Sequence, residues 1–269
     1  MKKTCIVLID CQNDFCNPEG SLFVKGAEED IVNIVNFIDR KRNFIDNIVT
    51  TMDSHYPFNI TNPSFWIVKN EQYIKNPALF TKITLEDVEN GVYETSNGYN
   101  AIPYLKHLKE NGSELTLWSS HCIINTRGWL LDRFLVECLN HWGIHKSKCY
   151  EIVMKGMHPH TDQYSIFNPE MEVNDEYGEA THNFQLLRKL SDDYDEIIFC
   201  GEASDICVKN SIKYLVESEL PWAKDILKKS IIFKDCMSAI DPNFNIDTDP
   251  VYVSAVEKGA KIINSIDYA

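Results

Sequence analysis

Three polar residues that could together perform nucleophilic catalysis stand where apolar runs of the sequence end. Cys207 follows such a run in GEASDICV, Lys155 follows another in VMKG, and Asp10 ends the first in LIDCQNDF. At the start of a helix, free N–H groups and the helix dipole favour a thiolate and can hold an oxyanion. A nearby ammonium stabilises both charges, and a carboxylate can carry the thiol proton to a leaving amine. These residue types therefore indicate a cysteine hydrolase.

A second group of residues has the chemistry of a metal site. Asp53-Ser-His55 follows a strand-like run, and His121 follows another in WSSHC. One carboxylate and two imidazoles suit a divalent transition metal that keeps open positions for water or substrate. We expect zinc, with iron or manganese as alternatives. A bare Asp-x-His also occurs in unrelated polar loops, so this prediction depends on the fold bringing His121 to the same place.

The elements that must position these residues alternate between strand and helix patterns. This alternation predicts an α/β fold with three α/β/α layers and a mostly parallel sheet. Strands are expected at Thr4–Asp10, Asn47–Met52, Leu115–Trp118, Tyr150–Met154, Glu196–Cys200 and Ser230–Lys234. Helices are expected at Glu28–Arg42, Tyr104–Glu110, Trp129–Trp142, Phe184–Leu190, Asp205–Glu217 and Val251–Lys258.

The strand ends decide how Cys207 is interpreted, because a lone cysteine is more often an inert buried residue. Right-handed crossovers place the carboxyl ends of parallel strands at one edge of the sheet, where sites of open α/β sheets lie. Asp10, His55, His121, Lys155 and Cys207 all follow predicted strands. We therefore expect the candidate catalytic and metal-binding residues to meet at that edge.

Composition limits the classes of partner. The chain has 269 residues and a net charge of -14, which argues against nucleic acid and anionic membrane surfaces. No apolar stretch is long enough to span a bilayer. The nine cysteines, an odd number scattered along the chain, are typical of free thiols in a reducing cytoplasm, and without a CxxC pair a structural zinc site is not expected. We expect one domain over residues 1–269, with an insertion at about 56–97 covering the site.

The motifs together resemble the isochorismatase-like cysteine hydrolases, over nearly the whole chain. The segments VLIDCQNDF and GEASDICV, with KG between them, carry the resemblance. It implies a catalytic triad of Asp10, Lys155 and Cys207, and an oxyanion hole formed by the N–H groups of Ala203 and Cys207. It also implies a cis peptide bond between Glu202 and Ala203. The family usually has an apolar residue where Glu202 stands.

Within that family, the Asp-x-His motif followed by a later histidine resembles the pattern of the nicotinamidases. There the metal holds the pyridine nitrogen while the cysteine attacks the carboxamide. The likeness implies that Phe15 and Trp118 sandwich the ring and that Tyr164 lines the pocket, although aromatic residues are more commonly core. Many relatives carry a further histidine shortly after the Asp-x-His. Here only Asn59 and Asn62 are available, so the metal is expected to keep more water.

The expected function is hydrolysis of nicotinamide to nicotinate and ammonia through a thioester. The alternative is another small-molecule amide, either a larger pyridine carboxamide or a carbamoylated amine, which Glu202 and the insertion would favour. A non-enzymatic binding module would be expected to lack the triad. The family likeness also makes a homo-oligomer an expectation. His158 and His160, close behind Lys155, are expected to be surface residues of a loop.

Overall fold

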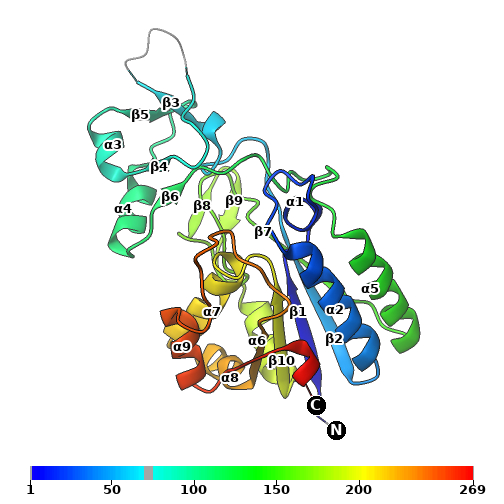
Figure 1. Cartoon of the computed structure of the whole chain (residues 1–269). Helices are drawn as coiled ribbons and strands as arrows, with labels where there is room; N and C mark the ends of the chain where they lie inside the picture. The colour runs from blue at the N-terminus through cyan, green and yellow to red at the C-terminus, as the bar shows by residue number, and fades with distance from the viewer. Residues whose placement is uncertain (1, 70–74, 269) are drawn as a thin grey trace.

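Six parallel strands form the central sheet of the computed structural model, which describes residues 2–69 and 75–268 (Figure 1). Their spatial order is β12-β11-β10-β1-β2-β7, and each neighbouring pair is parallel. The strands are β1 (Thr4–Ile9), β2 (Ile45–Asp53), β7 (Glu151–Lys155), β10 (Glu196–Gly201), β11 (Ser230–Phe233) and β12 (Lys261–Ile263). The carboxyl ends of all six strands therefore share one edge.

The burial of each strand explains its sequence pattern. Every residue of β1 and of β10 is buried, as expected for central strands with helices on both faces. β7 lies at the end of the sheet and alternates between more and less exposed residues, with Ile152 and Met154 on the exposed side. Its last residue, Lys155, is nevertheless buried. The Lys155 side chain is thus buried although its strand lies at the edge of the sheet.

Helices cover both faces of the sheet, which confirms the predicted three layers. On one face lie α2 (Ala27–Lys41) and α5 (Arg133–Lys146). On the other lie α6 (Phe184–Asp193), α7 (Cys207–Glu217), α8 (Pro221–Lys229) and α9 (Pro250–Glu257). The expected helices correspond to α2, α4, α5, α6, α7 and α9. The patterns missed α8 and the strand β12, as well as the short α1 (Asn13–Cys16).

A lobe beyond the carboxyl edge of the sheet has its own apolar cluster, which includes Trp66, Leu105 and Leu115 (upper left of Figure 1). It contains β3 (Trp66–Val68), β4 (Lys82–Ile83), α3 (Leu85–Glu89), β5 (Tyr93–Thr95), α4 (Ile102–Glu110) and β6 (Leu115–Thr116). Residues 70–74 of the expected insertion lie outside the described part of the chain. The two chain ends lie at the opposite end of the molecule.

The prediction of a sheet strand at Leu115–Trp118 is wrong. Only Leu115–Thr116 is a strand, β6, and it pairs antiparallel with β4 in the lobe. The reason is packing: Leu115 and Leu117 are buried in the apolar cluster of the lobe, together with Ile83. The local apolar run predicted a strand correctly but could not specify which partner the strand would pair with.

Two further short hairpin strands, β8 (Val173–Asp175) and β9 (Gly178–Ala180), follow the loop after β7. Short 3₁₀ turns lie at Pro63–Phe65 and Ser265–Asp267. None of the helices in the described residues combines the length and the apolar character that a membrane span requires.

Candidate active site

The three predicted triad residues meet at the carboxyl edge of the sheet. Asp10 follows β1, Lys155 ends β7 and Cys207 begins α7. The Lys155 side chain reaches across β2, and its Nζ lies 2.9 Å from Asp10 Oδ2 and 3.5 Å from Cys207 Sγ. The same Nζ lies 3.0 Å from Asp53 Oδ1 at the end of β2. One buried ammonium therefore joins the candidate nucleophile, the candidate base and the candidate metal site.

Electrostatics in this group keep the thiol of Cys207 protonated. Burial raises the pKa of Cys207 well above its usual range; Lys155 opposes this effect, while Asp10 and Asp53 reinforce it. In the free site, desolvation therefore opposes the thiolate that the start of the helix was expected to favour. Burial also raises the pKa of Asp10, although Lys155 opposes that shift. A carboxylate with a raised pKa is better suited to accept the thiol proton.

The loop between β10 and α7 has the unusual backbone that the family resemblance implied. The peptide bond between Glu202 and Ala203 is cis. Gly201 has a φ of +115°, and a Cβ added there would lie 2.1 Å from the backbone oxygen of Ile9. Only glycine fits so close to β1 in that conformation. The loop thereby turns sharply and brings Ala203 and Cys207 to the wall of one cavity.

Asp53, His55 and His121 also come together, as the sequence predicted. The Nε2 atoms of His55 and His121 lie 2.9 Å and 3.2 Å from Asp53 Oδ2. Their Nδ1 atoms face backbone oxygens, that of Gly156 at 3.0 Å and that of Ser119 at 2.7 Å. A carbonyl oxygen only accepts, so each Nδ1 carries a hydrogen. In the neutral tautomer that a metal ligand requires, each Nε2 lone pair then points toward Asp53.

These three residues fit a divalent transition metal. Two imidazole lone pairs and a carboxylate oxygen that converge in a buried place repel one another unless a cation lies between them. Nitrogen and oxygen ligands of this kind suit zinc, and backbone carbonyls that fix the ring tautomer are the usual outer partners of metal-binding histidines. The geometry therefore supports a metal held by Asp53, His55 and His121.

A second cluster of histidines has hydrogen-bond partners for most of its ring nitrogens. His158, His160 and Asp175 lie together, and both histidines are buried, so the expectation of surface histidines is wrong. The N–H of His160 donates to His158 Nδ1 at 3.2 Å, which leaves the hydrogen on His158 Nε2 for Asp175 Oδ1 at 3.2 Å. His160 Nδ1 lies 2.7 Å from Asp175 Oδ2. Hydrogen bonds thus account for three of the four ring nitrogens, and only His160 Nε2 lacks a partner among the described residues.

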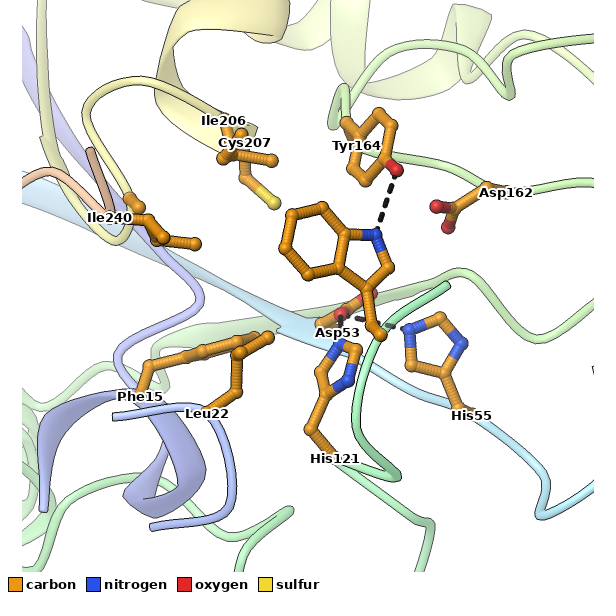
Figure 2. A pocket seen from close by; sticks show the side chains of 12 residues that line it. Phe15, Leu22, Asp53, His55, His121, Asp162, Tyr164, Ile206, Cys207 and Ile240 are labelled. Atoms are coloured by element: carbon orange, nitrogen blue, oxygen red, sulfur yellow. Dashed lines mark hydrogen bonds and ion pairs between the residues drawn. The ribbon is translucent and has the colours of Figure 1, made fainter. Parts of the chain in front are cut away.

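One cavity joins the thiol to the metal-binding group (Figure 2). Its empty volume, including the open mouth, is about 380 Å³. Trp118 and Tyr164 form one side, where Trp118 Nε1 donates to the Tyr164 hydroxyl at 3.0 Å, and the Phe15 ring lies 5.5 Å from that of His121. The lining residues that the sequence did not indicate are Leu22, Asp162, Ile206 and Ile240.

Two buried polar residues that the sequence reasoning passed over hold the metal-binding loops in place. Gln12 accepts the N–H of Asp53 at 2.7 Å and donates to its carbonyl oxygen at 2.8 Å. Asp14 accepts the N–H of Cys122, the neighbour of His121, at 2.6 Å. Because buried polar groups need partners, a glutamine and an aspartate directly behind a buried strand were the signal that could have identified them.

Asn59 and Asn62, the residues available after the Asp-x-His, are engaged elsewhere. Asn59 accepts hydrogen bonds from Thr61, and Asn62 donates to Ser120 Oγ at 2.6 Å while capping a 3₁₀ turn. Neither belongs to the cluster of candidate ligands among the described residues. Asp53, His55 and His121 therefore offer three protein ligands, and the remaining positions are left to water or substrate.

Comparison with known proteins agrees with this fold. No protein-family model matches the chain. It is 25% identical to the nicotinamidase of Saccharomyces cerevisiae, with 97% of this chain and 98% of the relative covered. Its structure is similar to the nicotinamidase and pyrazinamidase of Acinetobacter baumanii, with a TM-score of 0.64, 21% identity, and 99% and 98% of the two chains covered. The chain therefore has the fold of the isochorismatase-like hydrolases.

A further solved structure shares this fold at lower similarity. The pyrazinamidase of Pyrococcus horikoshii, solved in complex with zinc, has a TM-score of 0.53 and 18% identity, with 97% of this chain and 99% of that chain covered. The predicted fold class and the predicted resemblance to the isochorismatase-like hydrolases are thus confirmed.

Proposed function

We propose that this isochorismatase-like hydrolase is a metal-assisted cysteine amidohydrolase that converts nicotinamide to nicotinate and ammonia. One observation carries the proposal: Cys207 and the group of Asp53, His55 and His121 line the same cavity. A ring with a nitrogen and a carboxamide could reach both groups at once. The apolar and aromatic lining supports a flat aromatic substrate more than a carbamoylated amine. The nicotinamidases among the similar proteins also support it.

The proposed reaction assigns one task to each triad residue. Asp10 takes the proton of Cys207 as the sulfur attacks the carboxamide carbon, and later delivers it to the departing ammonia. The N–H groups of Ala203 and Cys207, with Lys155, stabilise the oxyanion. Water, deprotonated by Asp10, then cleaves the thioester and releases nicotinate.

Asp53, His55 and His121 would hold the metal, which when bound supplies a Lewis-acid position for the pyridine nitrogen. We propose zinc, which the zinc complex of the Pyrococcus horikoshii pyrazinamidase supports for the fold. We also propose that residues 56–97 cover the site as part of one domain. The ring of Phe80 lies 6.0 Å from that of Trp118, edge to face, in support. A reducing, cytoplasmic location is supported by nine free cysteines.

A panel of amides tests the substrate. Purified zinc-loaded enzyme is expected to release ammonia from nicotinamide and from pyrazinamide, and to release far less from an N-carbamoylated amine. The measurement is a coupled ammonia assay, with nicotinate identified by chromatography. Ammonia from the carbamoylated amine, with none from nicotinamide, would contradict the proposal and favour the alternative amide.

The metal site is tested by direct zinc binding. His121→Ala is expected to weaken zinc binding by more than about 100-fold, because losing a ligand costs more than losing an outer partner. Isothermal titration and elemental analysis after dialysis measure this without reference to catalysis. His160→Ala is the matched control, since the hydrogen-bonded cluster of His158, His160 and Asp175 should not change the zinc content. Unchanged zinc content in His121→Ala would rule out the proposed ligand set.

A further inference from the structure

Two buried carboxyl groups lie against the loop that carries Ala203. Glu202 directly precedes Ala203 and is 1% exposed, while Asp30, in the first turn of α2, is 6% exposed. The two side chains lie within hydrogen-bonding reach of each other. Each has a buried oxygen, Asp30 Oδ2 and Glu202 Oε1, to which no N–H or O–H group of another described residue outside the pair donates. The family resemblance offered no carboxyl group at this place.

A single proton explains these observations. Two carboxylates only accept hydrogen bonds, so a bond between them requires one to be protonated. Burial raises the pKa of Asp30 to about 6, and burial raises that of Glu202 well above its usual range. Glu202 is the more deeply buried of the two carboxyl groups, so we assign the proton to Glu202.

The surroundings supply little positive charge to replace that proton. The charged groups with the largest effects on the pair are other carboxylates: Glu29 on α2, Asp235 after β11 and Asp205 before α7. Glu202 also acts on the thiols of Cys11 and Cys16, near β1 and α1, and on that of Cys200 in β10, none of which carries positive charge. Loss of the proton would therefore place two like charges in a desolvated site.

Hydrogen bonds connect the pair to the catalytic loop. The N–H of Ser238 donates to Glu202 Oε2 at 3.2 Å, and the carbonyl of the same Ser238 accepts the N–H of Ser204 at 2.7 Å. On the other side, Gly201 donates to the carbonyl of Cys236 at 3.0 Å. Residues 201–204 are thus attached to residues 236–238 on both sides of Glu202. A shift of the Glu202 side chain would be transmitted to the adjacent Ala203 N–H.

We propose that Glu202 and Asp30 share one buried proton and act as positioning residues for the loop that presents the Ala203 N–H to the substrate oxyanion. The positioning role rests on the proposed function, whereas the shared proton does not. Neither carboxyl group lines the substrate cavity. Both act only through the backbone of the loop.

The sign of the pH effect follows from the raised pKa of Glu202. Below its ordinary value of 4.5, Glu202 is protonated in both the folded and the unfolded chain. As the pH rises above that value, the unfolded chain releases the proton and the folded chain retains it, so stability falls until the folded pKa is passed. Glu202→Gln keeps a hydrogen-bond donor for Asp30 but cannot titrate. It should therefore remove this part of the decline.

The first experiment measures the shared proton by urea unfolding at pH 5 and pH 8.5. The urea midpoint of the native enzyme is expected to fall more between these pH values than that of Glu202→Gln. Asp39→Asn, on the exposed side of the same helix, is the control and should follow the native enzyme. Identical pH dependence in the native enzyme and Glu202→Gln would overturn the shared proton.

The second experiment measures positioning through the pH profile of nicotinamide hydrolysis. Glu202→Ala is expected to lower kcat at least about 10-fold with KM changed less than about 3-fold, as expected for an interaction used mainly in the transition state. Glu202→Gln should restore kcat near neutral pH and extend activity to higher pH than in the native enzyme. A kcat profile of Glu202→Gln that coincides with the native one would overturn the positioning role.

A third experiment tests the positioning role separately from the proposed function. It measures the rate of Cys207 alkylation by iodoacetamide with peptide mass spectrometry. If the native enzyme does not hydrolyse nicotinamide, the proposed function fails, but the pair can still be judged. Glu202→Ala should then change the alkylation rate of Cys207 more than about 3-fold and Glu202→Gln should not, since Cys207 follows the same loop. Equal alkylation rates in all three proteins would overturn the positioning role independently of the substrate.

Discussion

Replacement of Cys207 by alanine is expected to reduce kcat for nicotinamide hydrolysis at least about 10⁴-fold, because no other thiol of the described residues lines the cavity. The sulfur lies 3.5 Å from Lys155 Nζ, and both atoms belong to buried side chains. Substrate binding should change little, since the cavity and the metal-binding group are kept. Ammonia release measures the loss, and equilibrium binding of nicotinamide to the inactive variant measures what remains.

Cys16→Ala is the matched control for this experiment. Cys16 is a buried thiol in α1, close to the site in the chain but absent from the cavity lining. Its pKa is raised well above its usual range by burial, as expected for an inert buried thiol. The control should retain hydrolysis within about 3-fold. Comparable activity in Cys207→Ala and Cys16→Ala would refute a thioester on Cys207.

The protonated thiol of the free site has a consequence for this mechanism. Because Cys207 holds its proton, attack requires Asp10 to accept that proton as the substrate arrives. Asp10→Asn should therefore resemble Cys207→Ala in activity, even though the sulfur is present. A helix dipole acting alone would have predicted a reactive thiolate without Asp10.

The sequence predicted those site residues whose positions follow from a local pattern and from the topology of the sheet. Asp10 follows the buried strand β1 and Lys155 ends the edge strand β7, and the topology of a parallel sheet brings the carboxyl ends of its strands to one edge whatever the details of packing. His121 was predicted for a partly wrong reason, since the strand before it belongs to the lobe and not to the sheet. Its loop is held near Asp53 by Asp14 instead.

The shared proton of Glu202 and Asp30 could not have been predicted from the sequence. Asp30 looks like an ordinary acidic residue in the first turn of a helix, where the dipole favours it. Glu202 was noticed only as a departure from the family pattern. Their proximity depends on how α2 packs against β10, and a pairing across so many residues leaves no periodic signal. Buried pairs of this kind become visible only in three dimensions.

Lys155→Met is expected to destabilise the fold by about 3–5 kcal/mol at neutral pH, the cost of removing one partner from a buried ionic group. The lysine side chain is almost fully buried between Asp10 and Asp53, with no solvent to replace its charge. Burial alone would lower its pKa, but these two carboxylates hold the pKa of Lys155 well above its usual range. Methionine fills a similar volume, so the loss of stability reports the missing charge and not a packing defect.

Urea unfolding across pH and with and without zinc distinguishes this explanation from a simple packing defect. Without the ammonium, Asp10 must keep a raised pKa, so the variant should lose stability as the pH rises above the ordinary value of 3.8 and recover part of it on acidification. Zinc bound to Asp53 supplies a positive charge nearby, so metal loading should reduce the difference in stability between the variant and the native enzyme.

Lys189→Met, which breaks a partly exposed pair with Glu151, is the control and should cost less than about 1 kcal/mol. Equal loss in both variants, or a loss in Lys155→Met that responds to neither pH nor zinc, would mean that Lys155 contributes only its methylene groups. In that case its assignment to the oxyanion would lose its electrostatic basis.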